Sequence, residues 1–99
     1  MAEFLRAAAV GEIPEGTGKP VQVGGKMVAL FNLAGEYFAI DDLCPHRGGS
    51  LGEGTLEGET VECPMHGWTF NIKTGQMPMG GGVASYPVRV EGDEIWVEV

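Results

Sequence analysis

The segment VALFNLAGEYFAI, residues 28–40, predicts the fold of the chain. Strand-forming residues flank a turn at residues 33–35, where Gly35 supplies the positive φ that a tight turn requires. The same pattern recurs in GTLEGETVEC (54–63), turning at Glu57 and Gly58, and in YPVRVEGDEIWVEV (86–99), turning at Gly92 and Asp93. In the last segment Tyr86, Val88 and Val90 alternate onto one predicted face. The sequence therefore predicts a chain of antiparallel hairpins.

Outside these hairpins, turn-forming residues dominate and helical periodicity is almost absent. The segment VGEIPEGTGKP (10–20) predicts a surface loop with one helical turn near residues 13–15, because Pro14 and three glycines prevent a longer helix. The segment GQMPMGGG (75–82) predicts a second irregular stretch. With 99 residues and 17 glycines, we expect one all-β domain, residues 1–99, built as a small antiparallel sandwich or barrel.

Charge and hydropathy limit the partners of this domain. The 14 acidic and 6 basic residues give a formal charge of -8, which argues against nucleic acid and anionic membranes and fits a partner with a basic face. The same acidity also fits a surface that is simply kept from self-association. No run of 18 apolar residues occurs, and MAEFLRAAAV does not resemble a secretory signal, so we expect a monomeric cytoplasmic protein.

Both cysteines and both histidines lie in two short segments. Cys44 and His46 form a C-x-H motif, and Cys63 and His66 form a C-x-x-H motif. The predicted hairpin at 54–63 would bring the two segments side by side, so that each could offer one sulfur and one nitrogen to a common centre. Thiolate with imidazole is a ligand set for a soft or borderline transition metal.

Three interpretations of this pattern are open. A disulfide between Cys44 and Cys63 would leave the neighbouring histidines unexplained. A structural zinc site takes four such ligands in a tetrahedron, although zinc-finger spacing usually pairs Cys with Cys and His with His. A [2Fe-2S] cluster with two cysteines on one iron and two histidines on the other accounts for the alternation of residue types.

The segments CPHRGGSL and CPMHGWTF resemble the paired loops of the Rieske family. The resemblance implies one [2Fe-2S] cluster per chain, bound within a part of about residues 42–80. It places Cys44 and Cys63 on the inner iron, and His46 and His66 on the outer iron at the tip of the domain. Small residues would let backbone N–H groups approach the sulfurs, and the candidates are Gly48, Gly49 and Gly67.

Departures from one branch of that family refine the expected function. Rieske proteins of cytochrome bc-type complexes carry an extra, disulfide-bonded cysteine in each loop, where this chain has Gly49 and Met65. Those proteins also place Ser and Tyr hydroxyls near the cluster, where this chain has Trp68 and Phe70. The resemblance then implies a potential toward the low end of about -150 to +300 mV. We expect Phe70 to lie in the core, and we expect Asp41 and Asp42 to cap the turn into the first loop.

The chain resembles a soluble Rieske-type ferredoxin, which implies transfer of one electron from a flavoprotein reductase to a terminal aromatic-ring oxygenase. We expect a carrier and not an enzyme, because oxygen activation at a mononuclear iron needs two further histidines and His46 and His66 are the only ones. A small subunit of the nitrite-reductase type and a zinc-stabilised interaction module are the alternatives. Pro78, with Met77 and Met79, resembles the family's third loop, which covers the cluster.

Overall fold

The structure is a computed structural model that describes residues 3–44, 49–64, 67–78 and 80–99. Its elements in chain order are β1 (Phe4–Ala9), the 3-10 turn η1 (Val10–Glu12), β2 (Thr17–Val23), β3 (Lys26–Leu33), β4 (Glu36–Asp41), the 3-10 turn η2 (Leu51–Glu53), β5 (Thr55–Glu57), β6 (Thr60–Glu62), β7 (Thr69–Asn71), β8 (Ser85–Tyr86), β9 (Val88–Glu91) and β10 (Glu94–Glu98). All strand pairs are antiparallel, and no α-helix occurs in the described ranges, so the predicted all-β class is confirmed.

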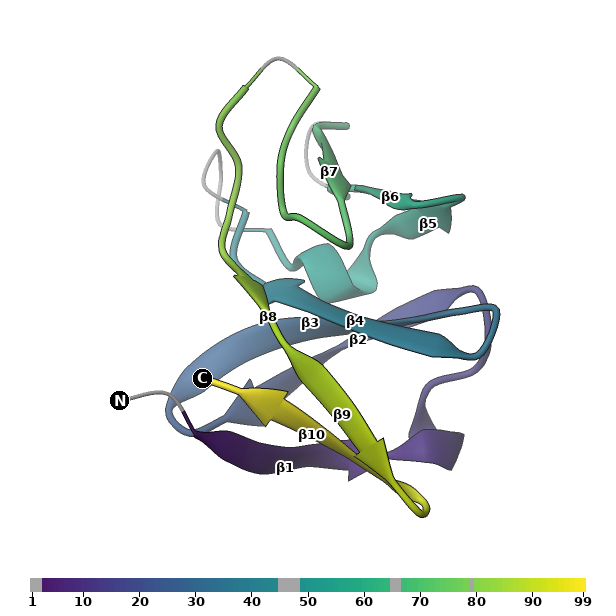
Figure 1. Ribbon diagram of the computed structural model, residues 1–99. Helices are drawn as coiled ribbons and strands as arrows, with labels where there is room; N and C mark the ends of the chain where they lie inside the picture. The colour runs from purple at the N-terminus through teal and green to yellow at the C-terminus, as the bar shows by residue number, and fades with distance from the viewer. Residues whose placement is uncertain (1–2, 45–48, 65–66, 79) are drawn as a thin grey trace.

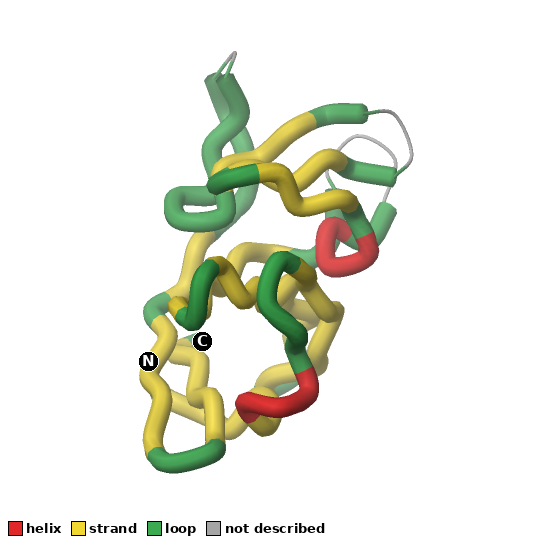
Figure 2. The backbone as a smooth tube through the Cα atoms, turned by 90° about the vertical axis from the view of Figure 1, so that its right-hand side faces the viewer, coloured by secondary structure: helices red, strands yellow, loops and turns green. Residues whose placement is uncertain are grey.

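Two of the three sheets form the base of the molecule. One has the strand order β1-β10-β9 and the other β2-β3-β4-β8. They enclose an apolar core to which both contribute, and β1 contacts β2 along one side while β9 contacts β4 along the other. Figure 2 shows this base from the side as strands arranged around a ring. The third sheet, β5-β6-β7, stands above β3 and β4 in Figure 1.

The VALF run at residues 28–31 separates two hydrophobic cores and contributes side chains to both. Val28 and Leu30 point into the core of the base, whereas Ala29 and Phe31 belong to a second core beneath the β5-β6-β7 sheet. All four side chains are fully buried. A strand buried on both faces needs a continuous apolar run and not an alternating one, which is why this segment joins the two halves of the domain.

The predicted hairpins are present, with small corrections. The turn at residues 92–93 falls where the sequence predicted it, and the turn predicted at 33–35 spans only residues 34–35, because Leu33 still pairs with Glu36. The middle turn lies at Gly58 and Glu59, one residue later than predicted, because Glu57 still pairs with Thr60. Tyr86 does not share a strand with Val88 and Val90: Pro87 cannot donate to a ladder, so Tyr86 ends β8, which pairs with β4.

The segment at residues 10–20 was predicted wrongly in two respects. The helical turn lies at Val10–Glu12, before Pro14, because the Glu12 carboxylate accepts a hydrogen bond of 2.9 Å from the Ala9 N–H and closes the turn there. Strand β2 already begins at Thr17 and runs through Pro20. Proline is tolerated because β2 is an edge strand of its sheet, where one side of the backbone needs no ladder partner.

None of the helical elements in the described part of the chain has the length and apolar character needed to cross a bilayer.

Candidate metal centre

Cys44 and Cys63 are brought into one buried apolar cluster. Their side chains are 1% and 2% exposed. The chain between them makes η2 and the β5–β6 hairpin, and this excursion returns Cys63 to the core that Cys44 enters from β4. The structure therefore places both cysteines where they could serve a single centre.

The two loops that carry these cysteines are closed in the same way. In the first, Leu43 forms a β-bridge with Ser50, and the Cys44 N–H donates to the Gly49 carbonyl at 2.8 Å. In the second, Glu62 pairs with Thr69, and the Cys63 N–H donates to the Trp68 carbonyl at 2.7 Å. Each cysteine thus begins a six-residue loop, 44–49 and 63–68, whose two ends are held together by backbone hydrogen bonds.

His46 and His66, predicted as the other two ligands, lie outside the described residues, as do Gly48, Met65 and Met79. Their predicted roles therefore remain predictions. The prediction for Gly67 is wrong, because its N–H donates to the Cys63 carbonyl at 3.1 Å and closes the second loop, so it is not directed at a sulfur. Gly49 acts through its carbonyl group, as the acceptor from Cys44.

The core around the cysteines is apolar. Phe70 has no exposed surface, which confirms its predicted place in the core. Other fully buried members of this core include Leu51, Val61 and Ile72, and the partly buried Trp68 packs against the core. A site shielded from water on its cysteine side suits thiolates that share an iron with bridging sulfides, so the described residues fit a [2Fe-2S] cluster.

A long segment, residues 75–84, rises beside the second loop and returns to β8; we call it the strap (Figure 1). It is itself a narrow hairpin: Gln76 bridges to Gly82, the Met77 N–H donates to the Gly81 carbonyl at 2.9 Å, and the Val83 N–H donates to the Gly75 carbonyl at 2.8 Å. The sequence predicted this segment to be irregular, whereas its two arms are joined by backbone hydrogen bonds.

The strap and the second loop face each other across an open groove. Its lining comes from Gly67, Trp68 and Thr69 on one side and Met77, Pro78 and Gly80 on the other. Met77 and Val83 also pack against the core that contains the cysteines. This position agrees with the expected role of the Pro78 segment as a cover of the site.

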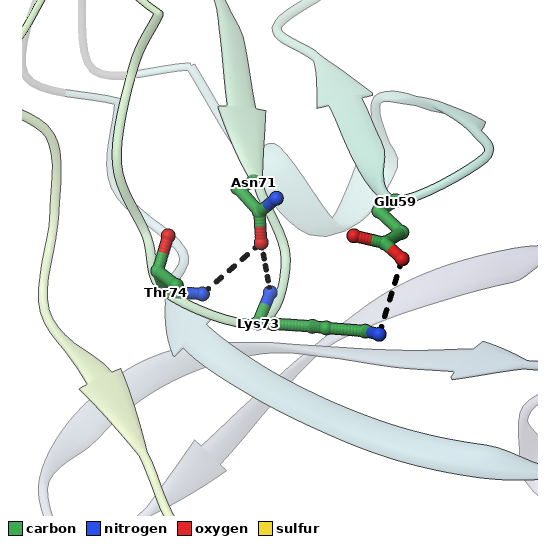
Figure 3. A network of polar contacts seen from close by, with 4 residues as sticks. All are labelled: Glu59, Asn71, Lys73 and Thr74. Atoms are coloured by element: carbon green, nitrogen blue, oxygen red, sulfur yellow. Dashed lines mark hydrogen bonds and ion pairs between the residues drawn. The ribbon is translucent and has the colours of Figure 1, made fainter.

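The base of the strap is fixed by a turn after β7 (Figure 3). Asn71 Oδ1 accepts hydrogen bonds from the backbone N–H groups of Lys73 and Thr74, at 2.8 and 3.2 Å. The Lys73 Nζ atom lies 3.1 Å from Glu59 Oε2 and 5.4 Å from the centre of the Phe38 ring. Lys73 therefore links the β5–β6 hairpin to β4 in the base.

Two adjacent aspartates were predicted to cap the turn into the first loop, and only Asp42 does so. Its Oδ1 atom accepts hydrogen bonds from Ser50 and Gly52. Asp41 instead accepts a short hydrogen bond from the Tyr86 hydroxyl and holds the end of the strap. Desolvation, with the Asp41 carboxylate as a second cause, raises the pKa of Tyr86 to about 12.

The arrangement of two closed Cys loops, a shared apolar core and a strap that lines a groove with the second loop is that of an iron–sulfur domain. Residues 3–87 match the family model of the Rieske [2Fe-2S] domain, and the chain belongs to that family. The cofactor of this family is one [2Fe-2S] cluster per domain.

Particular relatives narrow the comparison. The chain is 37% identical to the ferredoxin component of the naphthalene 1,2-dioxygenase system of Pseudomonas aeruginosa, over 98% of this chain and 96% of that one. It is similar to a chain in the complex of reduced oxygenase and oxidized ferredoxin in carbazole 1,9a-dioxygenase, with a TM-score of 0.84, 34% identity and coverage of 95% and 91%. The putative NADH-dependent nitrite reductase small subunit from Mycobacterium tuberculosis gives a TM-score of 0.90 at 25% identity, with coverage of 100% and 96%.

Proposed function

We propose that this protein is a one-electron carrier that takes an electron from a flavoprotein reductase and passes it to a terminal aromatic-ring oxygenase. In this proposal Cys44, His46, Cys63 and His66 hold the [2Fe-2S] cluster, within a cluster-binding part of about residues 42–80 of a single domain. The cluster supplies one-electron redox chemistry when it is bound.

One observation carries the proposal: both cysteines of the chain are buried in one core, at the start of two loops closed by the same backbone pattern. Such an arrangement shields the thiolates from water. His46 and His66 follow the cysteines in those loops by two and three residues. Imidazole ligands are neutral, so they lower the negative charge of the site and raise its potential above that of all-cysteine sites.

The residues around the site do not support catalysis at a second centre. Both histidines of the chain are used as ligands in this proposal, so none remains for a mononuclear iron with two histidines and a carboxylate. The proposed role is therefore that of a carrier. Trp68 and Phe70 carry no hydroxyl group that could stabilise the reduced state, which supports a potential toward the low end of the Rieske range.

The surface beside the loops fits docking to a protein. Leu43, directly before the first ligand, is 64% exposed. It lies in a groove with Met27, another exposed apolar residue, and with Val83 of the strap. The net charge of -8 favours a partner whose face is basic. We expect a monomer in the cytoplasm that meets its partners transiently.

A second candidate function has specific support. The similarity to the putative nitrite reductase small subunit covers this whole chain with a TM-score of 0.90. The higher sequence identity of 37% to a dioxygenase ferredoxin component favours the oxygenase system. Electron transfer from the reduced protein distinguishes the two, because each candidate names a different acceptor.

The decisive experiment measures iron, sulfide and the reduced-state EPR spectrum of the purified protein, followed by its reoxidation by a ring-hydroxylating oxygenase. We expect one [2Fe-2S] cluster per chain, a rhombic signal after reduction, and reoxidation that accelerates with oxygenase concentration. Cys63→Ser and His66→Ala should abolish the signal. A colourless protein, or a His66→Ala variant with full iron, sulfide and unchanged spectrum, would overturn the ligand assignment.

A further inference from the structure

The two ligand loops differ at their base. Counting back two residues from each cysteine gives Asp42 in the first loop and Val61 in the second. Val61 lies in β6 and pairs with Phe70 of β7 in a regular ladder. Asp42 has no such partner strand, because the chain that returns from the first loop forms the 3-10 turn η2 instead. The first loop thus needs another means to fix its returning end.

Asp42 fixes the returning end of the first loop. Its Oδ1 atom accepts hydrogen bonds from the Ser50 hydroxyl at 2.9 Å and from the Gly52 N–H at 2.8 Å. Its backbone carbonyl accepts a further bond from the Leu51 N–H at 2.7 Å. Three consecutive residues after the loop are therefore held by one residue before it.

The returning chain is also held from its other side. A Cβ atom on Gly52 would lie 2.5 Å from the Pro20 backbone nitrogen and 2.9 Å from Asp42 Oδ1, so Gly52 is pressed between β2 and the carboxylate. Leu51 is fully buried in the core that contains both cysteines. A change in the bonds to Asp42 would consequently be passed to the closure of the first loop at Cys44.

The Asp42 carboxylate is almost entirely removed from water, with only 6% of the residue exposed. No cationic side chain pairs with it among the described residues. Two residues of chain span at most about 7 Å, so the Cα atom of Asp42 lies within about that distance of the Cα atom of Cys44. A negative charge in a poorly screened position opposes the addition of an electron nearby.

We propose that Asp42 is a positioning residue of the first ligand loop whose buried carboxylate also biases the centre toward its oxidised state. The proposal rests on the proposed function, since it requires that Cys44 bind the cluster. In this proposal the midpoint potential depends on the Asp42 carboxylate as well as on the four ligands. The bonds to Ser50 and Gly52 fix the loop, and the charge adjusts the electron affinity.

The test compares Asp42→Asn, Asp42→Ala and the control Glu53→Gln, which removes an exposed charge from η2 itself. The readouts are iron and sulfide per chain, the rate of iron release to a chelator, and the midpoint potential from a redox titration followed by EPR. Asp42→Asn keeps an oxygen acceptor for Ser50 and Gly52, so we expect a normal cluster content and a more positive potential. The ratio of reduced to oxidised protein at fixed potential should rise by up to about tenfold, which is about 59 mV for one electron.

Asp42→Ala should release iron several-fold faster, and Glu53→Gln should match the unmodified protein in every readout. A loaded Asp42→Asn protein with an unchanged potential would overturn the proposal, as would an Asp42→Ala protein that releases iron at the normal rate. If neither Asp42 variant folds, Ser50→Ala decides: faster iron release supports the proposal and an unchanged rate overturns it. Failure of the proposed function would appear separately, as an unmodified protein without a cluster.

Discussion

Gly75 and Gly81 provide a matched pair of substitutions for testing whether the packing at the base of the strap stabilises the protein. Both adopt positive φ angles, +79° and +76°. A Cβ atom on Gly81 would meet nothing within 4 Å, whereas one on Gly75 would lie 2.1 Å from the Val83 carbonyl oxygen. The two Gly→Ala variants therefore share the backbone penalty and differ in the collision at the base of the strap.

The expected magnitudes follow from these two contributions. The left-handed conformation costs alanine about 1 kcal/mol or somewhat more, and this is the whole effect expected for Gly81→Ala. Gly75→Ala adds the cost of moving Val83, which packs against the core of the cysteines, and overpacking of this kind costs about 1 to 3 kcal/mol. For a domain of this size, each kcal/mol lowers the melting temperature by about 4 to 8 °C.

The assay is thermal unfolding of the cluster-loaded protein, followed by circular dichroism and by bleaching of the visible absorption at one fixed scan rate. We expect Gly81→Ala to melt about 4 to 8 °C below the unmodified protein, and Gly75→Ala to melt at least a further 4 °C lower and to bleach earlier. Equal melting temperatures for the two variants would refute the reasoning, because the collision at Val83 would then have no cost.

Three further predictions concern the docking surface, the anchor of the strap and the second core. Leu43→Glu should slow electron transfer to the oxygenase several-fold without changing the midpoint potential. The control Val90→Glu, at a residue 45% exposed in the base, should leave the transfer rate unchanged. Equal rates of the two variants in stopped-flow reoxidation would exclude Leu43 from docking. The pKa of Tyr86 is raised from 10 in the unfolded chain to about 12 in the folded protein. Between about pH 10 and 12 the unfolded state therefore loses the proton of the Tyr86 hydroxyl while the folded state keeps it. The contribution of Tyr86 to the free energy of unfolding is complete below pH 10 and is lost across that range. The stability difference between the unmodified protein and Tyr86→Phe in urea unfolding should shrink over that range, and a constant difference would contradict the role given to the bond with Asp41. Phe70→Ala should cost about 3 to 5 kcal/mol in denaturant unfolding and accelerate iron loss, since the ring is fully buried; a cost under about 1 kcal/mol would mean that this core is not tightly packed.

Much of the fold was predictable because it is encoded locally. The turns at 34–35 and 92–93 follow from residues within the hairpins themselves, and the all-β class follows from strand-forming residues between closely spaced turns. The errors came where a distant partner decides the conformation. Thr17–Pro20 is a strand only because β3 pairs with it, and Tyr86 ends a separate strand, β8, because it pairs with Ala39 of β4.

The ligand motifs were likewise visible in the sequence, because they use every cysteine and histidine of the chain. What the sequence did not reveal is how the loops are closed. The sequence predicted that the Gly67 N–H approaches a sulfur, yet in the fold it bonds to the Cys63 carbonyl. Asp42 was predicted only as an ordinary turn cap, whereas in the fold it is buried and bonded to Gly52 of η2, which is pressed against Pro20 of β2, 22 residues before Asp42 in the sequence.

The sequence by itself determined the type of centre and the class of fold, since ligand chemistry and turn formation depend on residue identity and short spacing. Only the tertiary structure decided that Cys44 and Cys63 enter one core and that the strap stands beside the second loop. It also decided that a carboxylate is buried at the base of the first loop. These features arise from packing between segments far apart in the chain, and no local pattern specifies which distant segments will pack together.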